Sequence, residues 1–131
     1  MRRAAVARLA TVDATGKPHL VPVCFTLLDE VVYTAVDHKP KRSQRLRRVA
    51  NVEATGVACL LIDEYQDDWS ALWWVRLDGV ARVVTDVAEA RRAVAALVAK
   101  YPQYADRPPT GPVLALDVRR WTGWAASAPS Q

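Results

Sequence analysis

The chain has 131 residues, 51% of them hydrophobic, and its formal net charge is +4. This length suits a single domain over residues 1–131, and the apolar content is sufficient for a real core. The basic residues are concentrated locally and are followed by the acidic stretch 63–68, so a chain-wide nucleic-acid surface is not implied.

The sequence also argues against a membrane segment and a metal site. No apolar run reaches the length of a membrane span, and the Arg-rich start lacks the long apolar stretch of a signal peptide. Cys24 and Cys59 lie in apolar, β-like runs without a CxxC pattern, and His19 and His38 have no ligand spacing. We therefore expect a cytoplasmic protein with reduced thiols, no bound metal and no membrane partner.

The first part of the chain predicts a β-hairpin. Two apolar, β-branched runs, Val6 to Val12 and Leu20 to Leu28, flank a segment rich in turn residues. Pro22 cannot donate a ladder hydrogen bond, so the second strand is expected at a sheet edge or at a bulge. A third strand is expected over residues 31–36 after a short turn.

A basic segment follows, because residues 39–48 hold six of the eighteen Lys and Arg side chains. Apolar residues at helical spacing predict a short amphipathic helix over residues 44–52, with Ser43 as its N-cap. Free backbone N–H groups and the helix dipole would meet three cations there, which favours a bound anion such as phosphate. A solvated basic helix face is the alternative. The three cations before the helix are Lys39, Lys41 and Arg42.

The middle of the chain predicts two further strands. Residues 56–62 form a short apolar run, and the acidic residues 63–68 are expected in an exposed loop. Residues 69–84 are long enough for one bent strand with Gly79 at a bulge.

The last part predicts a helix and a final strand. Asp86 and Glu89 have the spacing of a capping box, and the helical pattern continues to about Lys100. A proline-rich loop then precedes strand-like residues 113–118 and 121–126. Many short strands with little helix indicate a mainly β barrel or sandwich.

Motifs of protein-borne catalysis are missing from the sequence, which contains no GxSxG, HExxH, Walker loop or GxGxxG. A redox cofactor would supply the chemistry instead. The five Trp residues could form flat walls for an aromatic ring, although core burial or a subunit interface explains them as well. Trp73 and Trp74 are adjacent on a predicted strand, so one of them should face a ligand or a partner subunit.

Five segments in order resemble the split β-barrel proteins of the pyridoxamine-phosphate-oxidase-like superfamily, and more narrowly its deazaflavin (coenzyme F420)-dependent oxidoreductases. Each segment alone is weak, but the ordered set spans almost the whole chain. The segments are Arg8–Val23, Tyr33-Thr34, the loop with Lys39, Lys41 and Arg42, Trp74–Gly79 and Arg120–Trp124.

This resemblance implies an FMN- or F420-binding split barrel that forms a homodimer, with cofactor sites across the subunit interface. It also implies roles for particular residues. Val21, Pro22 and Val23 would lie along the tricyclic ring, with Tyr33 and Thr34 leading into the phosphate loop. Lys39, Lys41, Arg42 and Ser43 would hold the cofactor phosphate, and Trp74 and Arg76 would reach the site from the partner subunit. Trp121 and Trp124 would complete the interface or cover the ring.

The chain departs from the family in two places. It stops at Gln131 without the terminal Arg that grips pyridoxal phosphate in pyridoxamine oxidases, so pyridoxamine oxidation is not expected. The segment before the first strand is short. Within the basic segment, Arg45, Arg47 and Arg48 are expected on the solvated helix face.

The leading hypothesis is therefore an F420-dependent oxidoreductase that transfers a hydride between reduced deazaflavin and a small conjugated substrate. No side chain need act as a catalytic nucleophile, and Arg76 with backbone N–H groups would stabilise charge on the substrate. An FMN-binding oxidoreductase of the same fold is one alternative. A non-catalytic cofactor- or tetrapyrrole-binding protein is another. Nucleic-acid binding is not expected, because the aromatic residues are not interleaved with the basic ones.

Overall fold

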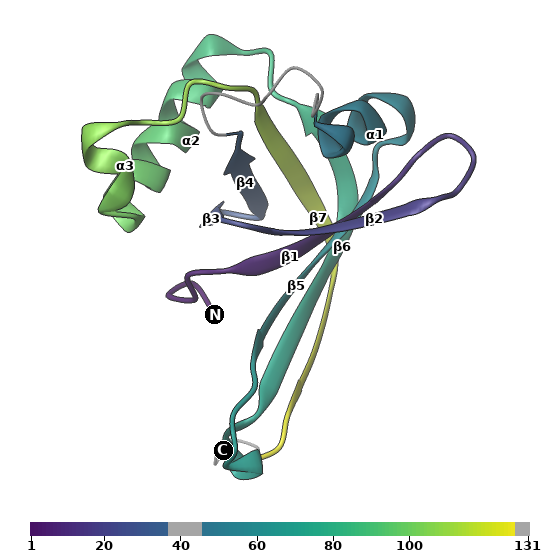
Figure 1. Cartoon of the computed structure of the whole chain (residues 1–131), viewed down its shortest axis with the longest axis vertical. Helices are drawn as coiled ribbons and strands as arrows, with labels where there is room; N and C mark the ends of the chain where they lie inside the picture. Colours follow the sequence, from purple (N-terminus) through teal and green to yellow (C-terminus); the bar gives the residue numbers. More distant parts are fainter. Residues whose placement is uncertain (37–45, 128–131) are drawn as a thin grey trace.

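The computed structural model describes residues 1–36 and 46–127. Within these residues, seven strands form one antiparallel sheet in the order β2-β1-β5-β6-β7-β4-β3. The two edge strands β2 and β3 are consecutive in the chain and are separated only by Cys24 and Phe25. The sheet therefore curls until its edges approach each other at this corner (Figure 1). The strands are β1 (Ala7–Val12), β2 (Pro18–Val23), β3 (Thr26–Leu28), β4 (Val31–Ala35), β5 (Val57–Glu64), β6 (Trp73–Val83) and β7 (Val113–Ala125).

The mainly β, barrel-like architecture agrees with the prediction, and so do the β1–β2 hairpin and the edge position of Pro22. One predicted strand is wrong in its extent. Residues 20–28 do not form a single strand, because the chain leaves the sheet at Cys24 and Phe25 and re-enters it as β3. Tyr101 explains this break, since its hydroxyl accepts a hydrogen bond from the Phe25 N–H at 3.0 Å in place of a neighbouring strand.

The long strand β6 contains the predicted bulge. Its register with β7 shifts between Asp78 and Gly79. A Cβ atom at Gly79 would overlap the carbonyl oxygen of Asp117, so only glycine allows this approach of the two backbones. The strand begins later than predicted, because residues Trp69–Ala71 form the 3₁₀ turn η2, which the Asp68 carboxylate caps. Residues 63 and 64 belong to β5 and not to the predicted loop.

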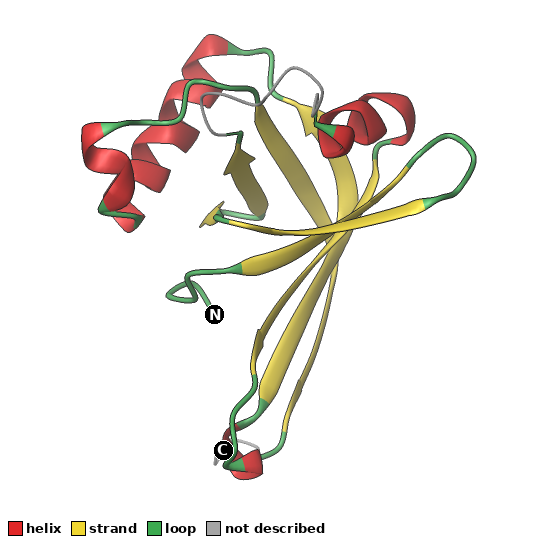
Figure 2. Cartoon of the chain, viewed as in Figure 1, coloured by secondary structure: helices red, strands yellow, loops and turns green. Residues whose placement is uncertain are grey.

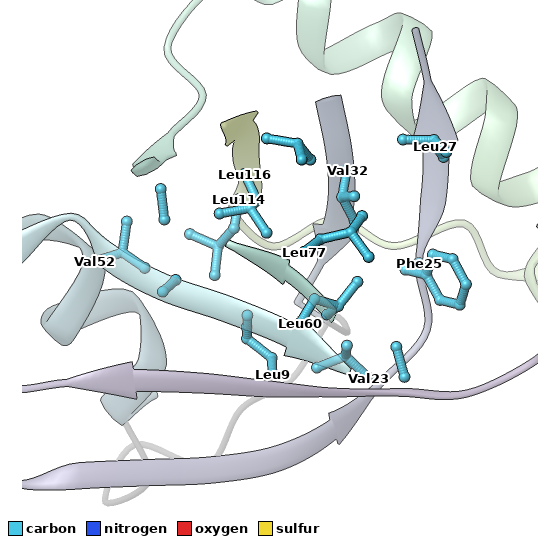
Figure 3. Close-up of a cluster of buried hydrophobic side chains, with 14 of the residues drawn as sticks. Leu9, Val23, Phe25, Leu27, Val32, Val52, Leu60, Leu77, Leu114 and Leu116 are labelled. Carbon is cyan, nitrogen blue, oxygen red and sulfur yellow. The ribbon is translucent and has the colours of Figure 1, made fainter. Parts of the chain in front are cut away.

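The inner face of the curled sheet encloses the main hydrophobic core (Figure 3). Leu9, Leu60 and Leu77 come from adjacent strands at matching register positions, and Phe25 reaches in from the corner. Leu114 and Leu116 add the side chains of β7, and all of these residues are at most 5% exposed. This alternation of buried residues along each strand places their neighbours on the outer face of the sheet.

Helix α1 (Arg47–Thr55) closes one end of the core with Val49 and Val52. The predicted helix of residues 44–52 begins too early, and the prediction that Ser43 is the N-cap is wrong, because Leu46 occupies that position without a side-chain cap. Ser43 itself lies outside the described residues. The physical reason is the backbone of Leu46, whose φ of −59° and ψ of 121° lie outside the helical region, so the helix cannot extend back through it.

Helix α2 (Val87–Lys100) packs on the other side of the sheet against β3, β4 and β7. Its side chains Ala93 and Leu97 form a second core with Tyr33 and Val113. The Asp86 carboxylate caps the helix as predicted, accepting from the Glu89 N–H at 3.0 Å. The Glu89 side chain turns instead to Arg82 and Tyr33, so the capping box is not reciprocal. A third helix, α3 (Gln103–Asp106), lies in the predicted proline-rich loop.

The helices α1, α2 and α3 gather at one end of the sheet, whereas β5, β6 and the end of β7 run together toward η2 at the other end (Figure 2). We call this extension the leg. It carries the exposed aromatic side chains of Tyr65, Trp69 and Trp124. Among the described residues, no helix is long and apolar enough to span a membrane.

Candidate cofactor site

The corner between β2 and β3 holds a small cavity of about 210 Å³, which we call the corner pocket. Residues from five parts of the fold meet there: the segment before β1, the end of β2 with the residue after it, the end of β4, α1 and α3. Half of the lining residues are apolar, and the others are one cation and three polar side chains. The lining residues are Val6, Pro22, Val23, Cys24, Thr34, Ala35, Arg48 and Tyr104.

Three residues that the resemblance assigns to cofactor binding meet in this pocket. Pro22 and Val23 come from one edge strand and Thr34 from β4, so the curl of the sheet brings them together across the corner. Val21 lies next to them in sequence but does not line the pocket; like Val23, it packs against the main core. Their roles toward a cofactor stay predictions.

Tyr33 lies on the other face of β4 from Thr34. It is 6% exposed and belongs to the second core, and its hydroxyl donates to Glu89 Oε2 at 2.6 Å. Burial, with the neighbouring Glu89 carboxylate, raises the pKa of Tyr33 to about 12. Glu89 also receives two hydrogen bonds from Arg82, at 2.9 and 2.7 Å, which lower its pKa to about 2. Tyr33 therefore forms a structural hydrogen bond with Glu89 and does not line the corner pocket.

Arg48 is the charged residue of the corner pocket, and the sequence predicted no place for it there. The expectation that it lies on the solvated face of the helix is wrong, because it is half-buried and lines the corner pocket. Its neighbour Arg47 is exposed, as expected. The available signal was weak: Arg48 precedes Val49 and lies one turn before Val52, at the margin of the buried stripe.

The predicted phosphate anchors Lys39, Lys41, Arg42 and Ser43 lie outside the described residues, as does His38. The structure describes the chain up to Val36 and again from Leu46. Ala35 and Arg48, just before and just after this segment, both line the corner pocket. The described structure therefore ends and resumes close to the pocket.

Lys100 and Tyr101, at the end of α2, form hydrogen bonds with the backbone of the corner between β2 and β3. Lys100 Nζ donates to the carbonyl oxygen of Phe25 at 2.8 Å and lies 3.5 Å from the centroid of its ring. The Tyr101 hydroxyl accepts from the Phe25 N–H and donates to the carbonyl oxygen of Ala5 at 2.8 Å. Burial lowers the pKa of Lys100 to about 8 and raises that of Tyr101. These contacts hold Cys24, the adjacent pocket residue, at a fixed place.

A second cavity of about 770 Å³ lies on the outer face of the sheet, along the leg. We call it the outer-face cavity. Its floor is built from alternate residues of adjacent strands, and the register pairs Leu61 with Arg76 and Trp74 with Trp124. The lining residues are Arg8, Ala10, Leu20, Cys59, Leu61, Asp63, Glu64, Tyr65, Leu72, Trp73, Trp74, Arg76 and Trp124.

The two Arg side chains of the outer-face cavity are ion-paired. Arg8 Nη1 lies 2.9 Å from Asp63 Oδ1, and Arg76 Nε lies 3.1 Å from Asp78 Oδ2. The Arg76 guanidinium also lies 5.9 Å from the centroid of the Trp74 ring. The cavity therefore combines broad apolar walls with balanced charge.

The two groups of predicted cofactor residues do not meet within one chain. Pro22, Val23 and Thr34 line the corner pocket, whereas Trp74 and Arg76 line the outer-face cavity. Trp73 packs against the main core and also reaches the rim of the outer-face cavity, and Trp74 lies on the outer face. This separation is compatible with the assignment of Trp74 and Arg76 to the partner's site.

The sequence matches the family model described as Pyridoxamine 5'-phosphate oxidase over residues 1–125. The chain belongs to this family. A search of the curated proteins finds no match.

Solved structures share the fold of this pyridoxamine 5'-phosphate oxidase family member at low sequence identity. A conserved hypothetical protein, Rv2991 of Mycobacterium tuberculosis, is 17% identical with a TM-score of 0.77, over 98% of this chain and 83% of that one. HutZ of Vibrio cholerae, described as a heme storage protein, is 19% identical with a TM-score of 0.73, over 93% and 86% of the two chains. An FAD-binding protein of Mycobacterium smegmatis is 18% identical with a TM-score of 0.66, over 94% and 86%. These likenesses confirm the split-barrel fold.

In the described part of this family member, no group of three His, Cys, Asp or Glu side chains is placed to hold a metal ion. Cys24 and Cys59 are free and half-buried. Burial, with the nearby Asp78 carboxylate, raises the pKa of the Cys59 thiol, which makes it a poor nucleophile near neutral pH.

Proposed function

We propose that the protein is a homodimeric oxidoreductase that uses a phosphorylated tricyclic cofactor, coenzyme F420 or FMN, to transfer a hydride to or from a small conjugated substrate. One observation carries the proposal. The corner pocket gathers three residues of the expected cofactor set, Pro22, Val23 and Thr34, with the cation Arg48. It does so close to where the described structure ends at Val36 and resumes at Leu46.

The residues present fit such a cofactor. Pro22 and Val23 offer an apolar surface for a ring, while the Thr34 hydroxyl and Arg48 offer hydrogen bonds to a polar tail. The pocket volume of about 210 Å³ is below the ~300–1,000 Å³ of sites that hold a whole ligand. A second surface must therefore complete the site, which agrees with a cofactor held between two subunits.

The bound cofactor would supply the hydride chemistry, and the protein would bind, orient and exclude water. In this scheme Val21, Pro22 and Val23 fix the plane of the ring, and Lys39, Lys41, Arg42 and Ser43 hold the phosphate. Tyr33 supports the strand that presents Thr34. No side chain of the chain is assigned a catalytic role.

Trp74 and Arg76 are assigned to the site of the partner subunit. The Arg76 guanidinium could stabilise negative charge on the substrate, with Asp78 holding its orientation through the 3.1 Å ion pair. The outer-face cavity supports this arrangement, because it is a broad apolar surface with paired charges. Such a surface suits burial against a second copy of the chain.

Cofactor binding is the first test. The purified protein is titrated separately with F420 and FMN while Trp and cofactor fluorescence are followed. We expect the protein to bind one of the two cofactors with micromolar or tighter affinity. If it binds neither cofactor, the proposal is wrong. Oxidation of the reduced cofactor is then measured with quinones and enones as hydride acceptors, and reduction of the oxidised cofactor is measured with pyridoxamine 5'-phosphate as a hydride donor.

F420 is placed first because of the sequence resemblance. A flavin is favoured by two solved structures of the same fold, from Mycobacterium smegmatis and Mesorhizobium loti, which are described as FAD-binding proteins. The relative affinities for F420, FMN and FAD decide between these cofactors. We expect the weaker binder to be displaced from the protein by the stronger one.

A second candidate is storage or transport of a tetrapyrrole without turnover. It is favoured by the likeness to HutZ, described as a heme storage protein. Titration with hemin, followed by its Soret absorption band, tests this function. Tight hemin binding together with no binding of F420, FMN or FAD would favour it over the oxidoreductase.

A further inference from the structure

Tyr101 directly follows α2 and is buried beside the corner pocket without lining it. Its side chain is 8% exposed, and its hydroxyl lies within hydrogen-bond distance of three backbone atoms. These atoms are the carbonyl oxygen of Ala5 at 2.8 Å, the N–H of Phe25 at 3.0 Å and the carbonyl oxygen of Phe25 at 3.2 Å. Ala5 and Phe25 are 96 and 76 positions from Tyr101, so one hydroxyl joins three distant parts of the chain.

The single proton of the Tyr101 hydroxyl is assigned by the other contacts at the corner. A tyrosine hydroxyl has one proton to donate, and its oxygen can also accept. The Phe25 carbonyl oxygen already accepts from Lys100 Nζ at 2.8 Å, so the Tyr101 proton belongs to the shorter contact with Ala5. The hydroxyl oxygen accepts from the buried Phe25 N–H. Tyr101 therefore links Ala5 to Phe25 through one donated and one accepted hydrogen bond.

Tyr101 is in this way connected to three of the residues that line the corner pocket. Val6 and Cys24 are each the sequence neighbour of a residue that is bonded to the Tyr101 hydroxyl. Tyr104 packs edge-to-face against the Tyr101 ring with the centroids 5.7 Å apart, and its N–H donates to the Tyr101 carbonyl oxygen at 2.9 Å. The three lining residues come from the segment before β1, the β2–β3 corner and α3.

Two further contacts support the same part of the fold. Arg2 Nη1 donates to the Leu27 carbonyl oxygen at 3.0 Å, and Ala7 pairs with Val23 in the β1–β2 ladder. Neither contact involves the Phe25 N–H, and a buried donor that loses its acceptor is costly. Loss of the hydroxyl should therefore loosen the corner while the sheet stays folded.

We infer that Tyr101 is the positioning residue of the corner pocket, which holds Val6, Cys24 and Tyr104 in the arrangement that binds the cofactor. The part of this inference that concerns affinity rests on the proposed cofactor-binding function. Without the hydroxyl, only a fraction of the folded molecules has all three residues in place. The apparent affinity falls in proportion to that fraction.

The experiment compares Tyr101→Phe, which removes the hydroxyl and keeps the buried ring, with the matched control Thr11→Val. Thr11 is 1% exposed, its hydroxyl accepts from Asn51 Nδ2 at 3.0 Å, and it does not line the corner pocket. Both substitutions thus remove the acceptor of a buried N–H group. Dissociation constants for FMN and for F420 are measured by fluorescence titration, and thermal unfolding compares the stabilities. Hydrogen–deuterium exchange with mass spectrometry reports on the segments 1–6 and 101–106.

We expect Tyr101→Phe to weaken binding of the cofactor that the wild type binds by about 5- to 30-fold, through a smaller binding-competent fraction. Hydrogen exchange should become faster in the segments 1–6 and 101–106 and stay unchanged in β5 and β6. Thr11→Val should lower the unfolding temperature by a similar amount and change the affinity by less than about twofold, because it is remote from the corner.

The outcomes separate this inference from the proposed function. If the wild type binds a cofactor and Tyr101→Phe binds it equally well, the inference is wrong while the proposed function stands. Equal losses of affinity in Tyr101→Phe and Thr11→Val overturn it too, because the loss would then follow stability and not the position of the pocket walls. If the wild type binds neither FMN nor F420, the proposed function is wrong. Hydrogen exchange still tests the positioning role in that case, and unchanged exchange in Tyr101→Phe overturns it.

Discussion

Glu89 is the centre of a polar network that joins the first turn of α2 to the sheet. Its carboxylate accepts from the Tyr33 hydroxyl and from two nitrogens of Arg82, and Arg82 Nε also donates to Asp117 at 2.8 Å. The Glu89 side chain is only 14% exposed, so its partners cannot easily turn to water when it is removed. We expect Glu89→Gln to lower the free energy of unfolding at pH 7 by about 1–3 kcal/mol.

The same network predicts a pH dependence. The pKa of Glu89 is lowered to about 2 from an ordinary value of 4.5, chiefly by the hydrogen bonds from Arg82. The contribution of the carboxylate is therefore complete above pH 4.5 and is lost as the pH falls toward 2. Urea denaturation between pH 7 and 2.5 should show the difference between wild type and Glu89→Gln shrinking over this interval. Glu53→Gln, at an exposed position on α1, is the control and should stay within about 0.5 kcal/mol of wild type.

Lys100 predicts a pH dependence of the same sign in an alkaline window. Burial lowers its pKa from 10.5 to about 8, so between these values the folded protein binds fewer protons at this site than the unfolded chain. Stability from this group rises with pH in that window. We expect the stability of wild type relative to Lys100→Met to increase between pH 8 and 10.5. Lys17→Met, in the exposed turn of the hairpin, should show no such trend.

The sequence predicted some of the residues that line the corner pocket and missed others. Pro22, Val23 and Thr34 came from the family resemblance, and the structure places them in one pocket. Arg48 could not be separated from Arg47 by charge or spacing, because their difference depends on which side of α1 the core covers. The side of α1 that the core covers depends on tertiary contacts, and two adjacent residues of the same charge give no indication of it in the sequence.

Gly79 allows the close approach of the β6 and β7 backbones at the bulge. A Cβ atom there would overlap the Asp117 carbonyl oxygen of the adjacent strand, and backbone cannot move aside as a flexible side chain can. We expect Gly79→Ala to lower the free energy of unfolding by about 2–3 kcal/mol. Gly123→Ala is the matched control, because its Cβ would meet Trp74 O at 3.4 Å, an ordinary contact. Equal effects of the two substitutions in urea denaturation would show that the bulge tolerates a side chain.

The elements that the sequence predicted well have local signals. Gly79 at the bulge, the Asp86 cap and the end of α2 near Lys100 each follow from a residue type at a fixed position. The start of α1 and the break of the second strand do not. Leu46 caps α1 without a capping side chain, and the break depends on Tyr101, which is 76 residues from Phe25 in sequence.

For the whole molecule, the curled sheet separates the two candidate binding surfaces. The corner pocket lies where the edges of the sheet approach each other, and the outer-face cavity lies along the leg. The order of the strands could not be read from the sequence, since β4 pairs with β7 across most of the chain. The β4–β7 pairing places β3 and β4 at the end of the sheet opposite β2, and the corner forms where the chain connects β2 to β3. The sequence alone could therefore list candidate residues but could not predict which of them share a pocket.

The proposed homodimer predicts that one exposed Trp of β7 lies in the subunit interface and another does not. Trp124 lies in the outer-face cavity opposite Trp74 and is 50% exposed, while Trp121 on the same strand is 41% exposed and is paired with Leu77 of the inner face. Residues three apart on a strand point to opposite faces, so the two form a matched pair. We expect Trp124→Asp to weaken the dimer at least about 30-fold, the effect of removing a central aromatic contact.

Sedimentation velocity over a range of concentrations measures this change, and Trp121→Asp should leave the dimer constant within about threefold. If the partner subunit supplies Trp74 and Arg76 to the corner pocket, as proposed, cofactor affinity in Trp124→Asp should fall in parallel with dimer formation. A monomeric Trp124→Asp protein that still binds the cofactor with wild-type affinity would show that one chain suffices. Unchanged dimerisation in both variants would place the interface on another face of the molecule.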